Sequence, residues 1–314
     1  MISRQLSPLI ELLSRGEAPA TASLAALSDL GRDEAAQLRA AWPLIPAGLR
    51  VSVIVQSMEL VDDSVDLDFI ELGLIALDDV SAEVRVRAAE SLFDAPQRSV
   101  AIRLLSRLND DSDHDVRAAV AGSLRQFVAL RELEQGDVEL GDAIVLALKA
   151  AFEDARSSVT LRASALESLG MCSLPWAAEL IAEGYVDDER TVRLAALVAM
   201  GDSAEDRWLE YVVDQFYADD PEFRFSAVLA AAQIGSEDAV EPLVELLADD
   251  DPEVVTLAIA AIGEIGGELA LEALLEYAET APPEFEELVS EAMQVASEFA
   301  SGDEDDDFLD DPEE

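Results

Sequence analysis

The sequence has very little of two residue types on which many catalytic and metal sites depend. Its 314 residues include one cysteine, Cys172, and one histidine, His114. One cysteine excludes a disulfide within the chain, and the two residues are too few for a zinc site built from several His and Cys ligands. We therefore expect no catalytic residues, no metal and no cofactor, and a role other than that of an enzyme.

Basic residues are also scarce. The chain has 20 Lys and Arg against 68 Asp and Glu, which gives a net charge of -48. Nucleic-acid affinity depends on cations that neutralise phosphates, and anionic membranes attract the same residues, so neither is an expected partner. No run of about 18 uncharged apolar residues occurs, and the N-terminus lacks the pattern of an export signal. We expect a cytoplasmic protein.

The few cations are unevenly distributed. Five basic and five acidic residues lie within residues 1–50, whereas no Lys or Arg follows Arg224 and 27 acidic residues occupy the last 90 positions. Such an end attracts basic proteins or peptides and repels acidic ones, with a strong dependence on salt. A coding bias or adaptation of the proteome to salt would give the same composition without any partner.

What the sequence does contain is a repeat. An acidic turn is followed by an aliphatic or aromatic anchor residue and an Ala-rich segment that closes near Gly. The anchors are Leu49, Val84, Val116, Val159, Val192, Phe223, Val254 and Phe285, at spacings of 35, 32, 43, 33, 31, 31 and 31 residues. The long spacing contains a polar insertion near residues 126–138, so we expect a longer loop or a helix extension there.

Each copy has the pattern of two helices. Residues 238–248 place apolar side chains at intervals of three, four and seven, which is typical of a helix buried on one side. Asp251 followed by Pro252 is a favourable start for the next helix. The second helices are expected to end at glycines, namely Gly170, Gly201, Gly235 and Gly263. Two short helices cannot enclose a core alone, so neighbouring copies must stack.

These strings resemble a known family. DDDPEVVTLAIAAIGEIG (249–266), ADDPEFRFSAVLAAAQIG (218–235) and DDSDHDVRAAVAGSL (110–124) are similar to HEAT repeats of the short bacterial type, including the PBS-lyase-like repeats, whose second helix opens with D-x-x-V-R-x-x-A. The resemblance covers roughly residues 45–297 and implies an all-α fold, an α–α superhelix of about eight antiparallel helix pairs that binds other macromolecules. It identifies no partner, and the oligomeric state stays open.

The predicted organisation has three parts. Residues 1–44 fit the repeat poorly and are expected to form a divergent helical cap, residues 45–300 form the solenoid, and residues 301–314 form an acidic disordered tail. Phe308 and Leu309 stand out among the nine carboxylates of that tail. They could bind another protein, fold back onto the solenoid, or belong to a segment that only confers solubility.

Angular sorting of the second helices predicts a binding surface. With each anchor as zero, positions +2, +6 and +9 lie opposite the packed face. Five apolar residues at +2 and +6 in three consecutive copies would form a ridge on the inner surface of the solenoid: Leu161, Leu194, Val198, Phe225 and Leu229. Exposed apolar patches often mark interaction sites. Tight curvature, a covering segment or a misassigned face would instead bury these side chains.

An arginine follows the anchor in most copies. Arg50, Arg85, Arg117, Arg193 and Arg224 could bind anions, but each is also close in sequence to an acidic pair, at 78–79, 110–111, 187–188 or 219–220. We favour a ladder of Asp–Arg contacts between successive turns, each worth about 0–1 kcal/mol if exposed.

The repeats predict a non-catalytic scaffold or adaptor that binds a protein segment in its inner groove. The alternative is an accessory or lyase-like HEAT protein that acts on a substrate protein, because similar repeats occur in the phycobilin lyase group. A helical-repeat protein that processes nucleic acid would need a basic groove, which this sequence does not supply.

Overall fold

The computed structural model describes residues 6–63 and 66–302. Within these ranges every regular element is an α-helix or a 3-10 helix, and no strand occurs. The chain forms two compact units that divide between Cys172 and Ser173. The repeats predicted as one span, 45–300, are therefore distributed over two units.

Unit 1 contains a helical N-terminal part and the first repeats. Its α-helices are α1 (Leu6–Ser14), α2 (Arg32–Ala41), α3 (Ala47–Asp63), α4 (Ile70–Ala76), α5 (Ala82–Glu90), α6 (Arg98–Asp110), α7 (His114–Glu132), α8 (Val138–Glu153) and α9 (Val159–Ser168). Two 3-10 helices, η1 (Thr21–Leu27) and η2 (Trp42–Leu44), flank α2. Part of the predicted insertion at 126–138 extends α7 to Glu132, so the helix extension that was one of the two expectations occurs.

Unit 2 contains four helix pairs. Its α-helices are α10 (Pro175–Tyr185), α11 (Arg190–Ser203), α12 (Leu209–Asp214), α13 (Pro221–Ile234), α14 (Val240–Glu245), α15 (Pro252–Ile265), α16 (Gly267–Ala278) and α17 (Glu286–Gly302). Short 3-10 turns extend α12 and α14, namely η3 (Asp206–Trp208), η4 (Gln215–Tyr217), η5 (Glu237–Ala239) and η6 (Leu246–Ala248).

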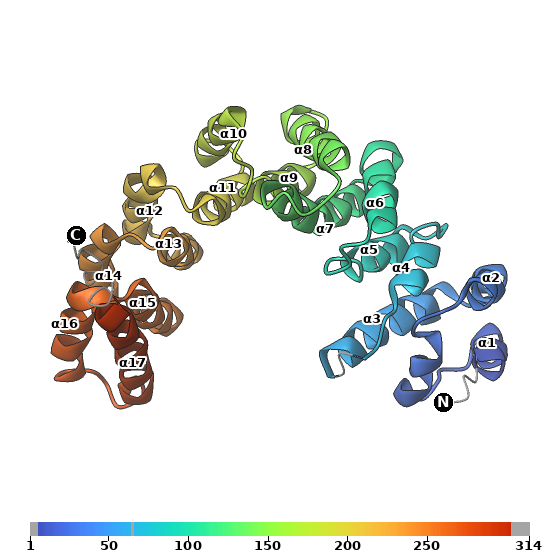
Figure 1. Cartoon of the computed structure of the whole chain (residues 1–314), viewed down its shortest axis with the longest axis horizontal. Coiled ribbons are helices and arrows are strands. Elements are labelled where there is room, and N and C mark those ends of the chain that lie inside the picture. The colour runs from blue at the N-terminus through green and yellow to red at the C-terminus, as the bar shows by residue number, and fades with distance from the viewer. Residues whose placement is uncertain (1–5, 64–65, 303–314) are drawn as a thin grey trace, which may run out of the picture. The chain divides into compact units, whose positions relative to one another are not determined.

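The helices of each unit lie in two layers (Figure 1). The helices that open at or next to the predicted anchors, here called B-helices, are α3, α5, α7 and α9 in unit 1 and α11, α13, α15 and α17 in unit 2. Consecutive B-helices of a unit pack on one another, and each B-helix except α3 also packs on the helix before it, here called its A-helix, such as α6 on α7 or α14 on α15. The anchors Val84, Val116, Val192 and Val254 are buried, which confirms the repeat pattern.

The acidic turns start the B-helices as predicted. Asp113 accepts hydrogen bonds from the backbone N–H groups of Asp115 and Val116, at 3.0 and 3.2 Å. Asp220 and Asp251 cap α13 and α15 in the same way, each with proline in the first turn. These bonds satisfy N–H groups that a helix leaves without an internal partner.

Only one of the three glycines predicted to end α11, α13 and α15 does so. Gly235 follows α13 at a φ of 71°, a left-handed conformation that favours glycine. Gly201 and Gly263 lie inside α11 and α15 instead. A Cβ atom at Gly263 would lie 2.9 Å from the Cα atom of Ala292 on α17, and one at Gly201 would lie 2.8 Å from the Cα atom of Ala230 on α13. Close packing of neighbouring B-helices therefore requires these two glycines.

Arginines that follow the anchors connect each repeat to the next. Arg85 donates from Nε and Nη2 to the carboxylate of Asp111, both at 2.8 Å, and from Nη1 to the backbone carbonyl of Asp79. Arg50 contacts Asp79 at 2.7 Å, and Arg224 binds the two carboxylate oxygens of Asp249 at 2.7 and 2.8 Å. The predicted Asp–Arg ladder is confirmed at these three steps.

The ladder is buried, so the small energies expected for exposed pairs do not apply. Asp79 and Asp111 are almost inaccessible, and the Arg85 side chain is nearly so. Burial alone would raise the pKa of Asp111, but hydrogen bonds from Arg85 and from the backbone N–H of Asp113 outweigh it and hold the pKa below its ordinary value. Removal of one partner from such a pair leaves an uncompensated buried charge.

Gly263, in close contact with α17, and Gly122, with open space around it, give a matched pair of variants. Gly263→Ala should lower the free energy of unfolding by about 1–3 kcal/mol, because α15 and α17 must separate to admit the methyl group. Gly122→Ala should raise it by about 0.5–1 kcal/mol, because a Cβ atom there meets nothing within 4 Å and alanine favours the helix. Urea denaturation followed by circular dichroism measures both. Equal effects of the two substitutions would contradict the close approach at Gly263.

The Arg85–Asp111 pair should show the asymmetry of buried charges. Arg85→Met removes the guanidinium that makes two hydrogen bonds to Asp111 and leaves only Arg107, at 3.5 Å, so it should cost about 3 kcal/mol. The double variant Arg85→Met/Asp111→Leu removes both charges and should be clearly more stable than the single variant. Urea denaturation of both proteins at pH 7 measures the difference. A double variant as unstable as the single one would show that the charges are not the cause.

The same pair should make stability depend on pH in a defined direction. Because the pKa of folded Asp111 is below its ordinary value, the ionised pair stabilises the fold above the unfolded pKa of about 3.9. That contribution is lost as the pH falls through the lower, folded value. The stability difference between the wild type and Asp111→Asn should therefore be constant near neutral pH and shrink below about pH 4. A difference that persists unchanged at lower pH would contradict this assignment.

Candidate functional site

The B-helix face of unit 2 carries four of the five residues of the predicted ridge. Leu194 and Val198 lie on α11 and are partly buried, as is Phe225 on α13, and Leu229 on α13 is 40% exposed. α11 and α13 pack in parallel register, because Gln233 donates to Asp202 across 31 positions and Arg190 contacts Asp220 across 30. Residues 31 positions apart, such as Leu194 and Phe225, therefore occupy equivalent places on neighbouring helices. We call these four residues the unit 2 ridge.

The fifth ridge residue, Leu161, was assigned to the wrong face. It is 0% exposed, so it cannot belong to an exposed ridge. The reason is a two-residue shift of the anchor in this copy: Arg162 donates to the backbone carbonyl of Phe152, as Arg117 does to that of Leu108. Leu161 is therefore the anchor in place of Val159, and its spacing to Val192 becomes 31 residues, as in the next repeats.

Unit 1 has a concave B-helix face that the angular pattern of positions +2 and +6 did not predict. A pocket of about 330 Å³ lies between α3, the start of α4 and the end of α5, and a more open groove of about 610 Å³ continues over α5, α7 and the start of α9. Four residues line both: Met58, Glu90, Phe93 and Asp94. Met58 and Phe93 each lie nine residues after an anchor, at the +9 position, where apolar residues could have been noticed alongside those at +2 and +6.

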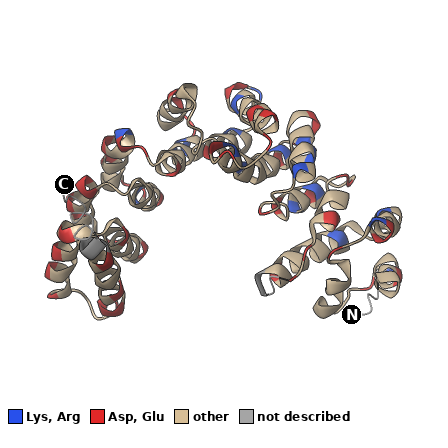
Figure 2. Cartoon of the chain, viewed as in Figure 1, with Lys and Arg blue, Asp and Glu red and all other residues tan. Residues whose placement is uncertain are grey.

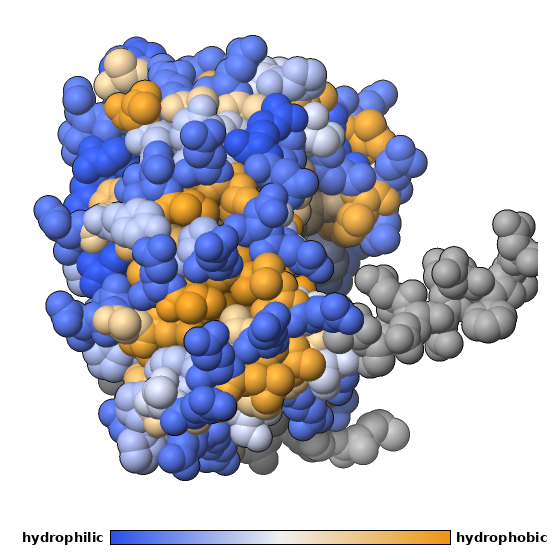
Figure 3. Space-filling view, turned by 90° about the vertical axis from the view of Figure 1, so that its left-hand side faces the viewer, coloured by the Kyte–Doolittle hydropathy of each residue, from blue (hydrophilic) through white to orange (hydrophobic). Residues whose placement is uncertain are grey.

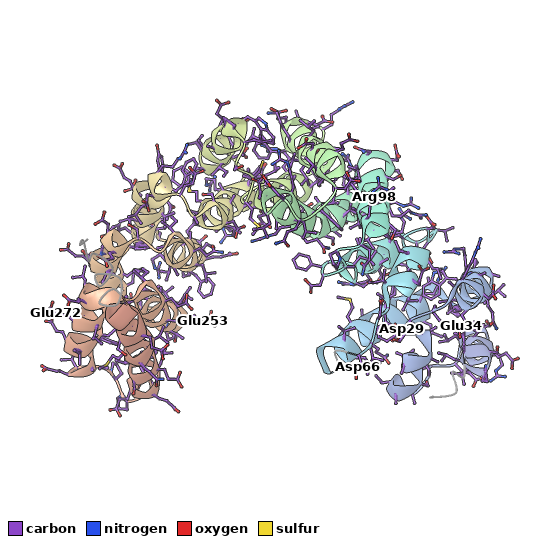
Figure 4. The ribbon with its side chains drawn as sticks, viewed as in Figure 1. Asp29, Glu34, Asp66, Arg98, Glu253 and Glu272 are labelled. Atoms are coloured by element: carbon purple, nitrogen blue, oxygen red, sulfur yellow. The ribbon has the colours of Figure 1, made fainter. Side chains whose placement is uncertain are left out.

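Acidic residues line the unit 1 concavities and dominate the C-terminal part of unit 2. The residues that line the unit 1 pocket and groove include Asp68, Glu90, Asp94 and Asp115 and contain no Lys or Arg. In unit 2 the helices after α13 carry acidic residues and no basic ones in their described part (Figure 2). Figure 4 shows that Glu253 of α15 and Glu272 of α16 point to opposite sides of unit 2, so acidic residues occupy both of its layers.

The A-helix layer of unit 2 also exposes apolar side chains. Figure 3 shows them in patches between hydrophilic residues on the side of unit 2 that lies at the left of Figure 1. Leu275 on α16 is 50% exposed, and Val244 on α14 and Leu269 on α16 are also exposed. Exposed apolar side chains therefore occur on both layers of unit 2. Leu275 in the A-helix layer can serve as a control for Leu229 on the B-helix face.

His114 and Cys172 do not come together in a common site. His114 is exposed at the start of α7, and Cys172 is buried. Residues 6–63 and 66–302 contain no cluster of three or more His, Cys, Asp or Glu that could hold a metal ion. In the same ranges no helix has the length and apolarity needed to span a bilayer. Phe308 and Leu309 lie outside the described residues.

The comparisons with known proteins agree with the repeat pattern. A family model for HEAT repeats matches residues 206–294. No curated protein sequence matches the chain.

Solved structures with a similar arrangement of helices are themselves distant in sequence. The crystal structure of YibA from Escherichia coli has a TM-score of 0.51 at 16% identity and covers 95% of this chain and 98% of that chain. Kap95p, in a structure with RanGDP, has a TM-score of 0.52 at 12% identity and covers 96% of this chain but only 46% of its own. Human deoxyhypusine hydroxylase has 18% identity over 94% of this chain and 97% of that chain, but a TM-score of 0.34, which carries no argument.

The fold and the family match support the same assignment. The structural likenesses show the fold alone, because sequence identity is low. The match to HEAT repeats at 206–294 covers α12 to α16 and the first part of α17. The 31-residue spacing of the anchors is most regular in this part of the chain. Residues 206–294 are thus recognisable HEAT repeats within an all-α array of helix pairs.

Proposed function

We propose that the protein is a non-catalytic scaffold that binds a basic segment of another protein on the B-helix face of unit 2. The observation that carries this proposal is the unit 2 ridge, a set of partly exposed apolar side chains on two packed helices. An apolar ridge supplies affinity, and the excess of acidic residues in unit 2 attracts a cationic partner and speeds its approach.

The fold supports a binding role. HEAT and armadillo arrays commonly bind proteins, and Kap95 was solved with RanGDP and with Nup1. The charge supports a basic partner rather than nucleic acid or an anionic membrane, because cations needed for phosphate contacts are absent after Arg224. A protein segment with both Lys or Arg and apolar residues fits both properties of the face.

The absence of catalysis is part of the same proposal. A nucleophilic cysteine needs access to substrate and a nearby base. Cys172 is buried and His114 is exposed in the first turn of α7, so neither residue has the surroundings that such chemistry requires. No observation favours the alternative of a lyase-like accessory factor over a scaffold.

Peptide binding tests the ridge directly. Peptides selected from a displayed random library on the wild-type protein should combine Lys or Arg with apolar residues. Leu229→Asp should weaken binding of a selected peptide about tenfold or more, because it removes an apolar anchor and places a charged group where an apolar contact must be buried. Fluorescence anisotropy of the labelled peptide measures the affinity. Raised salt should weaken binding further, because exposed charges are screened.

Leu275→Asp is the matched control. It places the same charge at a leucine of similar exposure in the A-helix layer, so it should leave the affinity within about twofold. Far-UV circular dichroism of both variants checks that helical content is retained. Equal affinity of wild type, Leu229→Asp and the double variant Leu194→Asp/Phe225→Asp would remove the basis for the ridge as a binding site. Loss of helical content in the double variant would mean that its residues are core.

A further inference from the structure

The pocket and the groove of unit 1 share one rim and differ in shape and lining. Apolar side chains of α3, α4 and the segment after α5 line the pocket, including Ile54, Ile70 and Leu72. The groove over α5 and α7 is shallower and is lined by small residues such as Ala118 and Gly122. Met58 and Phe93 lie on the shared rim, and Phe93 is 45% exposed. A bulky aromatic ring so exposed between two concave surfaces is available to a ligand.

Carboxylates surround this rim without cations among the lining residues. Glu90 and Asp94 line both concavities, and Asp115 lies at the groove. Glu90 pairs with Arg87 at 2.7 Å, but both side chains are substantially exposed, so the pair is easily exchanged for another. The rest of unit 1 has several arginines, for example in the buried ladder, so the absence of cations from the lining is a property of this surface and not of the unit as a whole.

We propose that this surface binds a cationic amphipathic segment of another protein, with one bulky apolar side chain in the α3–α4–α5 pocket and lysine or arginine side chains in the groove. The pocket of about 330 Å³ accepts the apolar anchor, and the rim carboxylates Glu90 and Asp94 pair with the flanking cations.

Charge selects this occupant over the others that an apolar pocket could hold. The acidic residues 301–314 of the same chain include nine carboxylates and would be repelled. A second copy of the protein carries the same net charge of -48 and would be repelled in the same way. A nucleic acid has no cations here to neutralise its phosphates. This inference shares with the proposed function only the expectation of a positively charged partner. The surface itself lies in unit 1, whereas the proposed function concerns unit 2.

The test uses a synthetic probe, a fluorescein-labelled helical peptide built only of leucine and lysine. Two matched peptides replace every leucine with serine or every lysine with glutamate. The wild-type protein should bind the leucine–lysine peptide more tightly than the serine–lysine peptide and should not bind the leucine–glutamate peptide. Hydrogen exchange of the backbone around residues 54–58 and 90–95 should slow when the leucine–lysine peptide is present.

Variants of the rim locate the binding. Phe93→Asp and Asp94→Lys should each weaken binding of the leucine–lysine peptide about tenfold, the loss expected for an interface anchor. Only Asp94→Lys should weaken binding of the serine–lysine peptide, because Phe93 contacts the apolar anchor. Leu146→Asp, at a leucine that is 57% exposed on the A-helix α8, should leave both affinities within about twofold. Asp94 is exposed, so its variant keeps the test informative even if Phe93→Asp does not fold.

The ridge variant Leu229→Asp separates this inference from the proposed function. Weaker peptide binding by Phe93→Asp together with unchanged binding by Leu229→Asp supports the unit 1 surface and removes the support for the ridge. Weaker binding by Leu229→Asp alone, with unchanged binding by Phe93→Asp and Asp94→Lys and no protection at 90–95, overturns the inference and leaves the proposed function intact. Unchanged binding by all three variants overturns both.

Discussion

A helix pair of this length cannot bury its own apolar face, and this constraint governs the structure. From α5 onward each B-helix packs on the A-helix before it and on the neighbouring B-helices of its unit, so the core of each unit is a continuous layer between helices. Buried Arg–Asp pairs join successive turns, as at Arg85–Asp111 and Arg224–Asp249. Apolar burial holds the repeats together, and the directional bonds of each guanidinium set the spacing at which they meet.

Close helix packing has a second consequence for the B-helix face. Where α11 meets α13 and α15 meets α17, glycine allows backbone contact, so the helices stand side by side with little space between them. In unit 1 a pocket forms beside α5, which is only nine residues long and ends at Glu90, with Phe93 in the turn that follows. The different lengths of the B-helices thus produce a ridge in unit 2 and a hollow in unit 1 from the same repeat.

Electrostatics distinguish the interior of the protein from its exposed surface. Arginines are used where a carboxylate would otherwise be buried alone, and Asp79, Asp111 and Asp249 each obtain one. Exposed carboxylates also pair with arginines, as Glu90 does with Arg87 and Glu222 with Arg190, but exposed pairs are individually weak. The single Lys and the 19 Arg implied by a total of 20 basic residues suit this use, because the arginine fork binds a carboxylate through two parallel bonds.

The sequence by itself determined the helical repeat, most of its anchors, the capping aspartates and the pairing of arginine with aspartate, because each depends on residues close together in a regular period. It also determined the charge of the exposed faces. Tertiary structure decided that Leu161 is an anchor and that Gly201 and Gly263 allow close contact between helices instead of ending them. It also decided that the Asp–Arg ladder is buried and that Phe93 borders a pocket. Periodicity gives the angle of a side chain around its own helix, whereas exposure depends on how near the neighbouring helices lie, and only packing sets that distance.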